Sequence, residues 1–186
     1  MTVSPRAKLL LIAAMFLTPI AASIGAYVFV NVRPTANYGE LLIPPAAITS
    51  HTFAREDGTA FQFADLRDRW ILVTSDSGEC PKSCADRLHM MRQVRIALGR
   101  DATRVARVFV VDDVKAPDPS ALGPREDLVV ALTPRGLRLP PGAANDRAYI
   151  YLADPRGNVM MRWPGDPDFR RMLKDLQTLL KASQIG

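Results

Sequence analysis

The stretch Trp70–Cys84 reads WILVTSDSGECPKSC and contains the clearest structural signals in the chain. Residues 70–74 are a short, largely apolar run of the kind that forms a strand buried on both faces. Pro81 then favours the first position of a helix, and Gly99 supplies a stop. Between them, apolar side chains recur at helical spacing, at Cys84, Leu88, Met91, Val94 and Leu98. The stretch therefore predicts a buried strand that runs directly into a helix.

Further elements follow outward from this pair. Residues 51–54 and 60–63 flank Asp57-Gly58 and predict a hairpin. Residues 105–111 predict a second buried strand, 148–153 and 159–163 a second hairpin, and residues from Asp168 onward a closing helix. Residues 127–132 fit a strand or one turn of a core helix, and 134–146 are loop-like. A β-α-β unit followed by a hairpin and a helix is the thioredoxin-like arrangement. The predicted fold class is α/β, a mixed sheet with flanking helices.

Composition limits the class of protein. The chain has 186 residues, 48% of them apolar and 23% charged, which fits one compact domain with an appendage. Its two cysteines exclude a disulfide-dense mini-protein and a four-cysteine zinc module. The net charge is +5, but positive and negative residues are interspersed, so we expect a mixed surface and no nucleic-acid partner.

The N-terminal residues predict a membrane anchor. No charge interrupts the chain from Leu9 to Val30, a helix of roughly 33 Å against a hydrocarbon core of about 30 Å. A cleaved signal peptide is the alternative. Arg6 and Lys8 precede the run and Arg33 follows it, which favours a cytoplasmic N-terminus. We expect a tail at 1–8, a transmembrane helix at 9–30, a tether at 31–50 and the thioredoxin-like domain at 51–186. In a bacterium this domain faces the periplasm from the inner membrane, where disulfides persist.

Cys80 and Cys84 are the candidate site. Both lie at the predicted start of a helix, whose partial positive charge lowers a thiol pKa, and one turn of helix separates them, so a disulfide is within reach. Lys82 would favour a thiolate, and Glu79 would oppose it. Three interpretations stay open: a redox-active or copper-binding dithiol, a structural disulfide, and incidental free thiols.

The motif Cys80-Pro81-Lys82-Ser83-Cys84 resembles that of the Sco/SenC family of copper chaperones and thiol oxidoreductases, which assist cytochrome c oxidase assembly. Residues 57–74 resemble the family's approach to its cysteine pair, and residues 108–112 its strand that ends in Asp. Residues 151–157, YLADPRG, resemble its Tyr-Leu-x-Asp-Pro-x-Gly segment. The resemblance covers about residues 51–182 and implies a thioredoxin-like fold.

One feature departs from that family, whose members carry a copper-ligating His shortly before the Tyr-Leu segment. This chain has Asn145-Asp146-Arg147 there, and its histidines are His51 and His89. Neither is expected to be a ligand, a thioether from Met160 or Met161 is less expected than core packing, and Asp146 would be a weak oxygen ligand. Two thiolates suit Cu(I), whereas Cu(II) binding in the family also depends on the imidazole. Thiol–disulfide exchange needs only the two cysteines.

The resemblance implies a membrane-anchored periplasmic thiol–disulfide oxidoreductase or copper chaperone in cytochrome c oxidase assembly. Its partner would be an oxidase subunit or a copper carrier protein. Cys80, at the helix start, is expected to be the more exposed attacking thiolate and Cys84 the resolving thiol. One alternative is a general periplasmic disulfide reductase, which the residues before Ala148 disfavour because no proline stands there. The other is an assembly scaffold with structural or vestigial cysteines.

Overall fold

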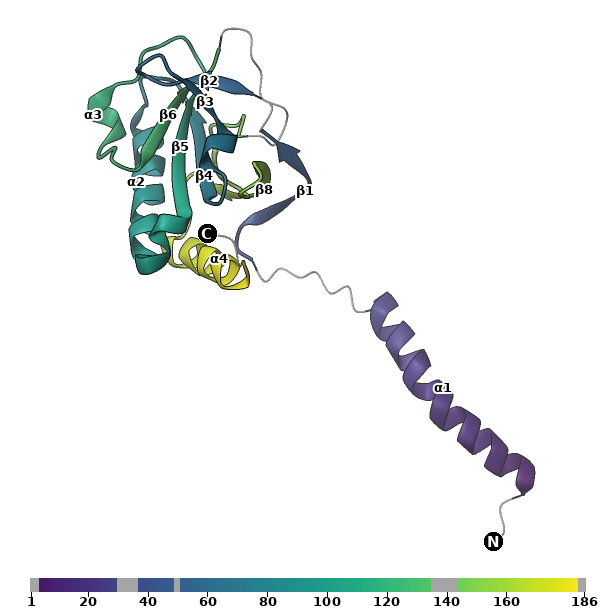
Figure 1. The fold of residues 1–186 in the computed structure, drawn as a ribbon. Coiled ribbons are helices and arrows are strands. Elements are labelled where there is room, and N and C mark those ends of the chain that lie inside the picture. Colours follow the sequence, from purple (N-terminus) through teal and green to yellow (C-terminus); the bar gives the residue numbers. More distant parts are fainter. Residues whose placement is uncertain (1–3, 30–36, 49–50, 135–143, 184–186) are drawn as a thin grey trace. The chain divides into compact units, whose positions relative to one another are not determined.

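A computed structural model describes residues 4–29, 37–48, 51–134 and 144–183, in two compact units, Met1–Ala36 and Asn37–Gly186 (Figure 1). The first unit holds helix α1 (Pro5–Phe29). Its Pro5–Gly25 part has a mean hydropathy of 2.0, none of it is buried, and it is long and apolar enough to cross a membrane. The predicted tail and anchor boundaries stay predictions.

The second unit is built on an eight-stranded sheet in the described residues, with the strand order β1-β8-β7-β4-β5-β6-β2-β3. The strands are β1 (Glu40–Ala47), β2 (Thr52–Ala54), β3 (Ala60–Gln62), β4 (Trp70–Asp76), β5 (Val105–Val111), β6 (Leu128–Leu132), β7 (Tyr149–Ala153) and β8 (Asn158–Pro164). Strands β4, β5 and β6 run parallel, and the other pairings are antiparallel. The predicted α/β fold class, a mixed thioredoxin-like sheet, is confirmed.

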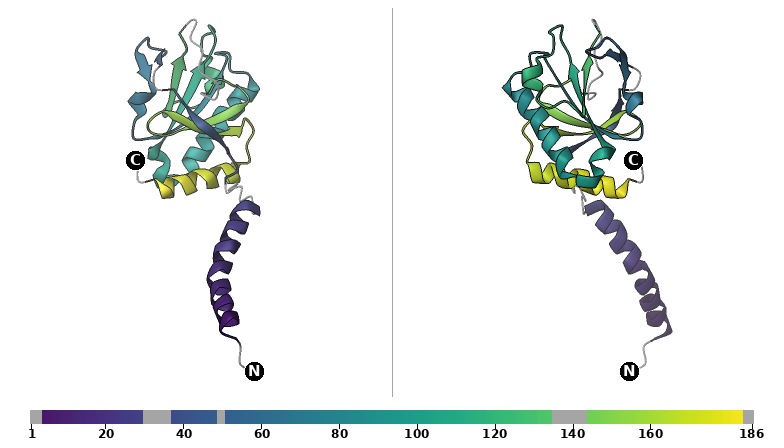
Figure 2. Two further views of the ribbon diagram at one scale, coloured as in Figure 1. Left: turned by 90° about the vertical axis from the view of Figure 1, so that its right-hand side faces the viewer. Right: turned by 60° about the vertical axis from the view of Figure 1, so that its left-hand side comes forward.

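Alternating side chains of β4 feed two separate cores. Leu72 packs with α2 (Lys82–Ala97) and α4 (Phe169–Ala182), which lie together on one face of the sheet (Figures 1 and 2). Ile71 and Val73 pack on the other face with phenylalanines of the β2–β3 hairpin and of the short helix η1 (Phe63–Leu66). Burial on both faces is why residues 70–73 read as a continuous apolar run.

The remaining short elements lie at the two ends of β5. Helix η2 (Gly99–Arg104) leads into the strand, and α3 (Pro119–Leu122) follows it. The ambiguous segment 127–132 forms strand β6, in parallel register with β5. Residues 135–143 of the predicted loop 134–146 lie outside the described residues.

Within the predicted tether at 31–50, Glu40–Ala47 forms an edge strand antiparallel to β8. The register shifts between Leu41 and Ala46, and Pro44 and Pro45 lie inside that irregular stretch. Proline cannot donate a ladder hydrogen bond but is accepted on an edge strand or in a bulge. The two prolines therefore conceal a strand whose pairing depends on residues more than a hundred positions away.

Candidate functional site

Cys80 and Cys84 form a disulfide at the junction of β4 and α2, with 5.1 Å between their Cα atoms. Pro81 is the residue before the helix, and its carbonyl accepts hydrogen bonds from the amides of Cys84 and Ala85 at 2.8 and 3.1 Å. Cys80 has a φ of 41°, in the left-handed region that non-glycine residues adopt infrequently. The sequence-based expectation that a disulfide is within reach is thus confirmed.

Both cysteines are buried in this oxidised state. Cys80 is 3% exposed and Cys84 is 0% exposed, and both belong to the core between the sheet and helices α2 and α4. The expected contrast in exposure between the two thiols is therefore small in the structure. A partner protein can reach either sulfur only if the segments around the pair move.

The segment that follows β5 lies directly against Gly78, just before the cysteines. The Gly78 amide donates to Asp113 Oδ1 at 3.1 Å, and the Gly78 carbonyl accepts from the Asp118 amide at 3.0 Å. A Cβ atom on residue 78 would stand 2.1 Å from the carbonyl oxygen of Lys115. Only glycine allows this approach, so residues 113–118, which we call the 113–118 segment, pack backbone to backbone against the residue two positions before Cys80.

A buried ion pair supports the strand end on the helix side. Asp76, 3% exposed, pairs with Arg87 of α2, 4% exposed, and the Arg87 Nε also donates to Thr74 Oγ1 at 3.1 Å. Such a pair is expensive to break because the remaining charge would be buried alone. It fixes the first two turns of α2 to the end of β4.

Arg147 joins the carboxylates at the ends of the two parallel strands. It donates to both oxygens of Asp112, at 3.0 and 2.5 Å, and its Nη1 lies 3.4 Å from Asp76 Oδ1. Its Nη2 is 4.0 Å from Asp113 Oδ2. Arg147 stands in the loop before β7, so this position carries a cation that is already bound to carboxylates.

The electrostatics of Asp113 connect this cluster to the 113–118 segment. Burial would raise the pKa of Asp113, but hydrogen bonds from Ser77, Gly78 and Lys115, with the charge of Arg147, outweigh burial and lower the pKa below its ordinary value. The ionised carboxylate is therefore the form that holds the cysteine approach in place.

The two charged residues that flank Cys80 are each neutralised. Lys82 pairs with Asp86 at 2.6 Å, and Glu79 pairs with Lys115, also at 2.6 Å. The opposing effects expected from Lys82 and Glu79 on a thiolate are thus both weakened. The position at the helix start remains the main local influence that favours a thiolate.

The residues present fit copper only as Cu(I). Among the described residues, no group of three or more His, Cys, Asp or Glu side chains could hold a metal ion. His51 precedes β2 and His89 lies on α2, and neither forms such a group with the cysteines. Two sulfur donors suit soft Cu(I), whereas Cu(II) prefers additional nitrogen or oxygen ligands. Copper would therefore be cargo carried by the reduced pair.

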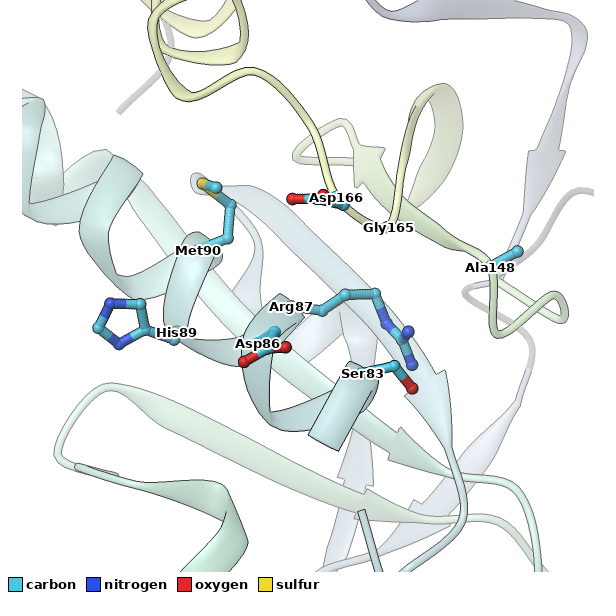
Figure 3. A pocket seen from close by; sticks show the side chains of 8 residues that line it. All are labelled: Ser83, Asp86, Arg87, His89, Met90, Ala148, Gly165 and Asp166. Carbon is cyan, nitrogen blue, oxygen red and sulfur yellow. The ribbon is translucent and has the colours of Figure 1, made fainter. Parts of the chain in front are cut away.

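A pocket of about 500 Å³ opens beside the first turns of α2. Figure 3 shows Arg87 reaching from α2 toward Ala148, while His89 projects from the other side of the helix. Gly165 and Asp166, between β8 and α4, complete the opposite wall. Neither sulfur lines this pocket, so it lies beside the disulfide and does not contain it.

Sequence reasoning found the cysteines but missed the residues that hold them. Arg87 reads as one more polar position on α2, and Arg147 reads only as a replacement for a ligand. The available signal was the acids that end the two buried strands, Asp76 and Asp112-Asp113, because the carboxyl ends of parallel strands meet at one edge. Three acids at one edge require cations nearby.

A family model described as a transmembrane-like, thioredoxin-like C-terminal domain matches residues 70–183. No curated protein sequence matches the chain.

Solved structures of similar fold belong to the Sco group. Yeast Sco1 with copper bound has a TM-score of 0.60 at 14% identity, over 75% of this chain and 92% of that one. Apo Sco1 from Thermus thermophilus has a TM-score of 0.58 at 16% identity, over 77% and 97%. A SCO1/SenC family lipoprotein from Bacillus anthracis has a TM-score of 0.56 at 16% identity, over 75% and 99%. The resemblance stated from the sequence is thereby confirmed at the level of the fold.

Proposed function

We propose, since the chain belongs to the family of transmembrane-like proteins with a thioredoxin-like C-terminal domain, that it is a membrane-anchored thiol–disulfide oxidoreductase. Its place would be the assembly of cytochrome c oxidase, with the domain on the periplasmic side of a bacterial inner membrane. The observation that carries the proposal is the Cys80–Cys84 disulfide at the start of α2. The fold of the Sco proteins supports the assembly role, because three of the similar structures are copper-bound and one is described as a member of a family of cytochrome c oxidase assembly proteins.

The exchange reaction uses the two sulfurs in sequence. In the reduced chain, the Cys80 thiolate attacks one sulfur of a partner's disulfide, forms a mixed disulfide and expels the partner's other sulfur as a thiolate. Cys84 then attacks Cys80, which releases the partner's second thiol and closes the Cys80–Cys84 bond. Two electrons pass to the partner, whose two sulfurs take up the two protons that this chain's thiols lose.

The assignment of roles follows from position. Cys80 precedes the helix, whereas Cys84 lies within its first turn and is completely buried. A buried resolving thiol is protected from outside disulfides but lies next to its partner sulfur. We therefore assign Cys80 as the attacking group and Cys84 as the resolving group.

The test is trapping of a mixed disulfide by the full chain in membranes. Cys84→Ser should accumulate a covalent complex with an oxidase subunit or a copper carrier protein, and Cys80→Ser should not. Ser83→Ala, which changes an exposed side chain inside the same motif, is the matched control and should cycle normally. A Cys84→Ser chain that loses redox cycling without trapping any partner would count against these roles.

Cu(I) delivery is a second candidate, because the reduced pair offers two sulfur donors and the yeast neighbour carries copper. Titration of the reduced chain with Cu(I) against a competing chelator should give one-to-one binding that Cys80→Ser abolishes. Binding no stronger than the chelator's would leave thiol exchange alone. A cysteine-free chain that still supports oxidase assembly would instead favour the scaffold alternative.

A further inference from the structure

The exposed face of α4 carries basic side chains without compensating acids within the helix. Arg170, Arg171, Lys174 and Lys181 are exposed, and the helix's single carboxylate, Asp175, is buried at 7% exposure. The opposite face places Met172, Leu176 and Leu180 in the core. Two acids precede the helix in the sequence, Asp166 and Asp168, and the Asp168 carboxylate caps the helix by accepting from the Arg171 amide at 2.8 Å.

The chain joins the domain at this same helix. The amides of Tyr38 and Gly39 donate to the two oxygens of Asp175 at 3.0 and 2.8 Å. The Tyr38 hydroxyl accepts from the Asp168 amide at 3.1 Å, and the Arg171 guanidinium lies 4.1 Å from the Tyr38 ring centre. Figure 1 shows the start of β1 next to α4. The first residues of the domain are therefore fixed to α4 by contacts along its N-terminal half.

The length of chain before Asn37 limits how far this helix can be from a membrane that holds α1. Residues 30–36 connect α1 to Asn37, and a chain of that length spans at most about 29 Å. Whatever the path of those residues, the point where the chain meets α4 stays within that distance of the end of α1.

We propose that the exposed face of α4 binds the anionic phospholipid headgroups of the membrane that carries α1. This inference rests on the proposed membrane anchoring. Ammonium and guanidinium groups pair with lipid phosphates, and juxtamembrane basic residues are attracted to anionic leaflets. The positive charge of the face and its short connection to α1 thus both favour anionic phospholipid headgroups as the ligand.

The experiment uses the full chain in lipid nanodiscs, either of phosphatidylcholine alone or of phosphatidylcholine mixed with phosphatidylglycerol. Lysine acylation followed by mass spectrometry measures the exposure of individual ammonium groups. We expect Lys174 and Lys181 to be labelled several-fold more slowly in the anionic nanodiscs. Lys82 and Lys115, on the cysteine side, serve as internal controls and should be labelled equally in both. Salt at about 1 M, where the Debye length is about 3 Å, should remove the difference.

Charge reversal provides the matched variants. Arg170→Glu should restore fast labelling of Lys174 in anionic nanodiscs, whereas Arg156→Glu, in the exposed turn between β7 and β8, should not. Equal labelling of Lys174 in the two lipids, in a chain that remains with the nanodisc, would overturn the inference. A chain that leaves the nanodisc during size-exclusion chromatography would refute the anchoring, and with it the premise of the inference.

Discussion

Gly78→Ala adds one methyl group where the cysteine approach meets the 113–118 segment. The new Cβ would lie 2.1 Å from the Lys115 oxygen, 2.7 Å from the Lys115 carbonyl carbon and 2.8 Å from the Ala116 oxygen. All three are backbone atoms, so no side-chain rotation relieves the clash and the two segments must separate. Overpacking of this kind costs about 1–3 kcal/mol.

Separation also breaks the two hydrogen bonds of Gly78, to Asp113 and from Asp118. At about 0.5–1.5 kcal/mol each, their loss brings the expected destabilisation to about 2–4 kcal/mol, allowing for partial relaxation. Urea unfolding of the oxidised chain measures this value. Because the backbone two residues before Cys80 is then no longer held by the 113–118 segment, the rate at which a small dithiol reduces the Cys80–Cys84 bond should rise several-fold.

Gly165→Ala is the graded control. Its Cβ would lie 3.0 Å from the Ala148 oxygen and 3.0 Å from the Arg87 Cδ, a flexible side-chain atom, so a cost of about 1 kcal/mol is expected. If Gly78→Ala lowers stability by less than Gly165→Ala does, or leaves the reduction rate unchanged, then packing of the 113–118 segment against Gly78 does not control access to the disulfide.

Three further perturbations test other parts of the structure. Asp175→Ala removes the acceptor of three N–H groups, from Tyr38, Gly39 and Trp163, and should lower the free energy of unfolding in urea by about 3 kcal/mol. The control Asp166→Ala, at an exposed position, should lower it by less than about 0.5 kcal/mol. Arg87→Met leaves Asp76 buried without its main cation and should lower the free energy of unfolding by about 3–5 kcal/mol. If the double variant with Asp76→Asn regains stability in the same assay, the uncompensated charge of Asp76 is the cause. The pKa of Asp113 is lowered on folding, so its contribution to stability is complete above its unfolded pKa of about 3.9 and disappears as the pH falls through the lower folded value. The urea midpoint of the wild type should therefore fall more steeply below about pH 4 than that of Asp113→Asn, and parallel pH profiles would contradict this role.

Local signals explain what the sequence could predict. Strand β4 is predicted by the apolar run at residues 70–73, and helix α2 by a helix-start proline followed by apolar residues at helical spacing. The β7–β8 hairpin is equally predictable because the residues Asp154-Pro155-Arg156-Gly157 strongly favour a turn. The cysteine pair lies between β4 and α2, which both have strong local signals, and its place in the fold could therefore be predicted.

The features that escaped prediction depend on distant residues. Strand β1 exists because β8 offers it an edge, and nothing in residues 40–47 alone distinguishes it from a proline-containing tether. Arg147 acquires its role only when folding brings together the ends of β4 and β5. Gly78 looks like an ordinary loop glycine until the Lys115 backbone is seen against it. In each case the missing information is a tertiary contact and not a local preference.

The attachment of Tyr38 and Gly39 to Asp175 also has a mechanical consequence. Tension transmitted through the residues that precede Asn37 reaches the domain first at two amides that share one carboxylate, on a helix rooted in the core. The load is thus borne by two hydrogen bonds in parallel before it can act on the ladder between β1 and β8. Without these two bonds, a pulling force would break the β1–β8 hydrogen bonds one after another. With them, we expect the strand to stay paired until the contacts to Asp175 break.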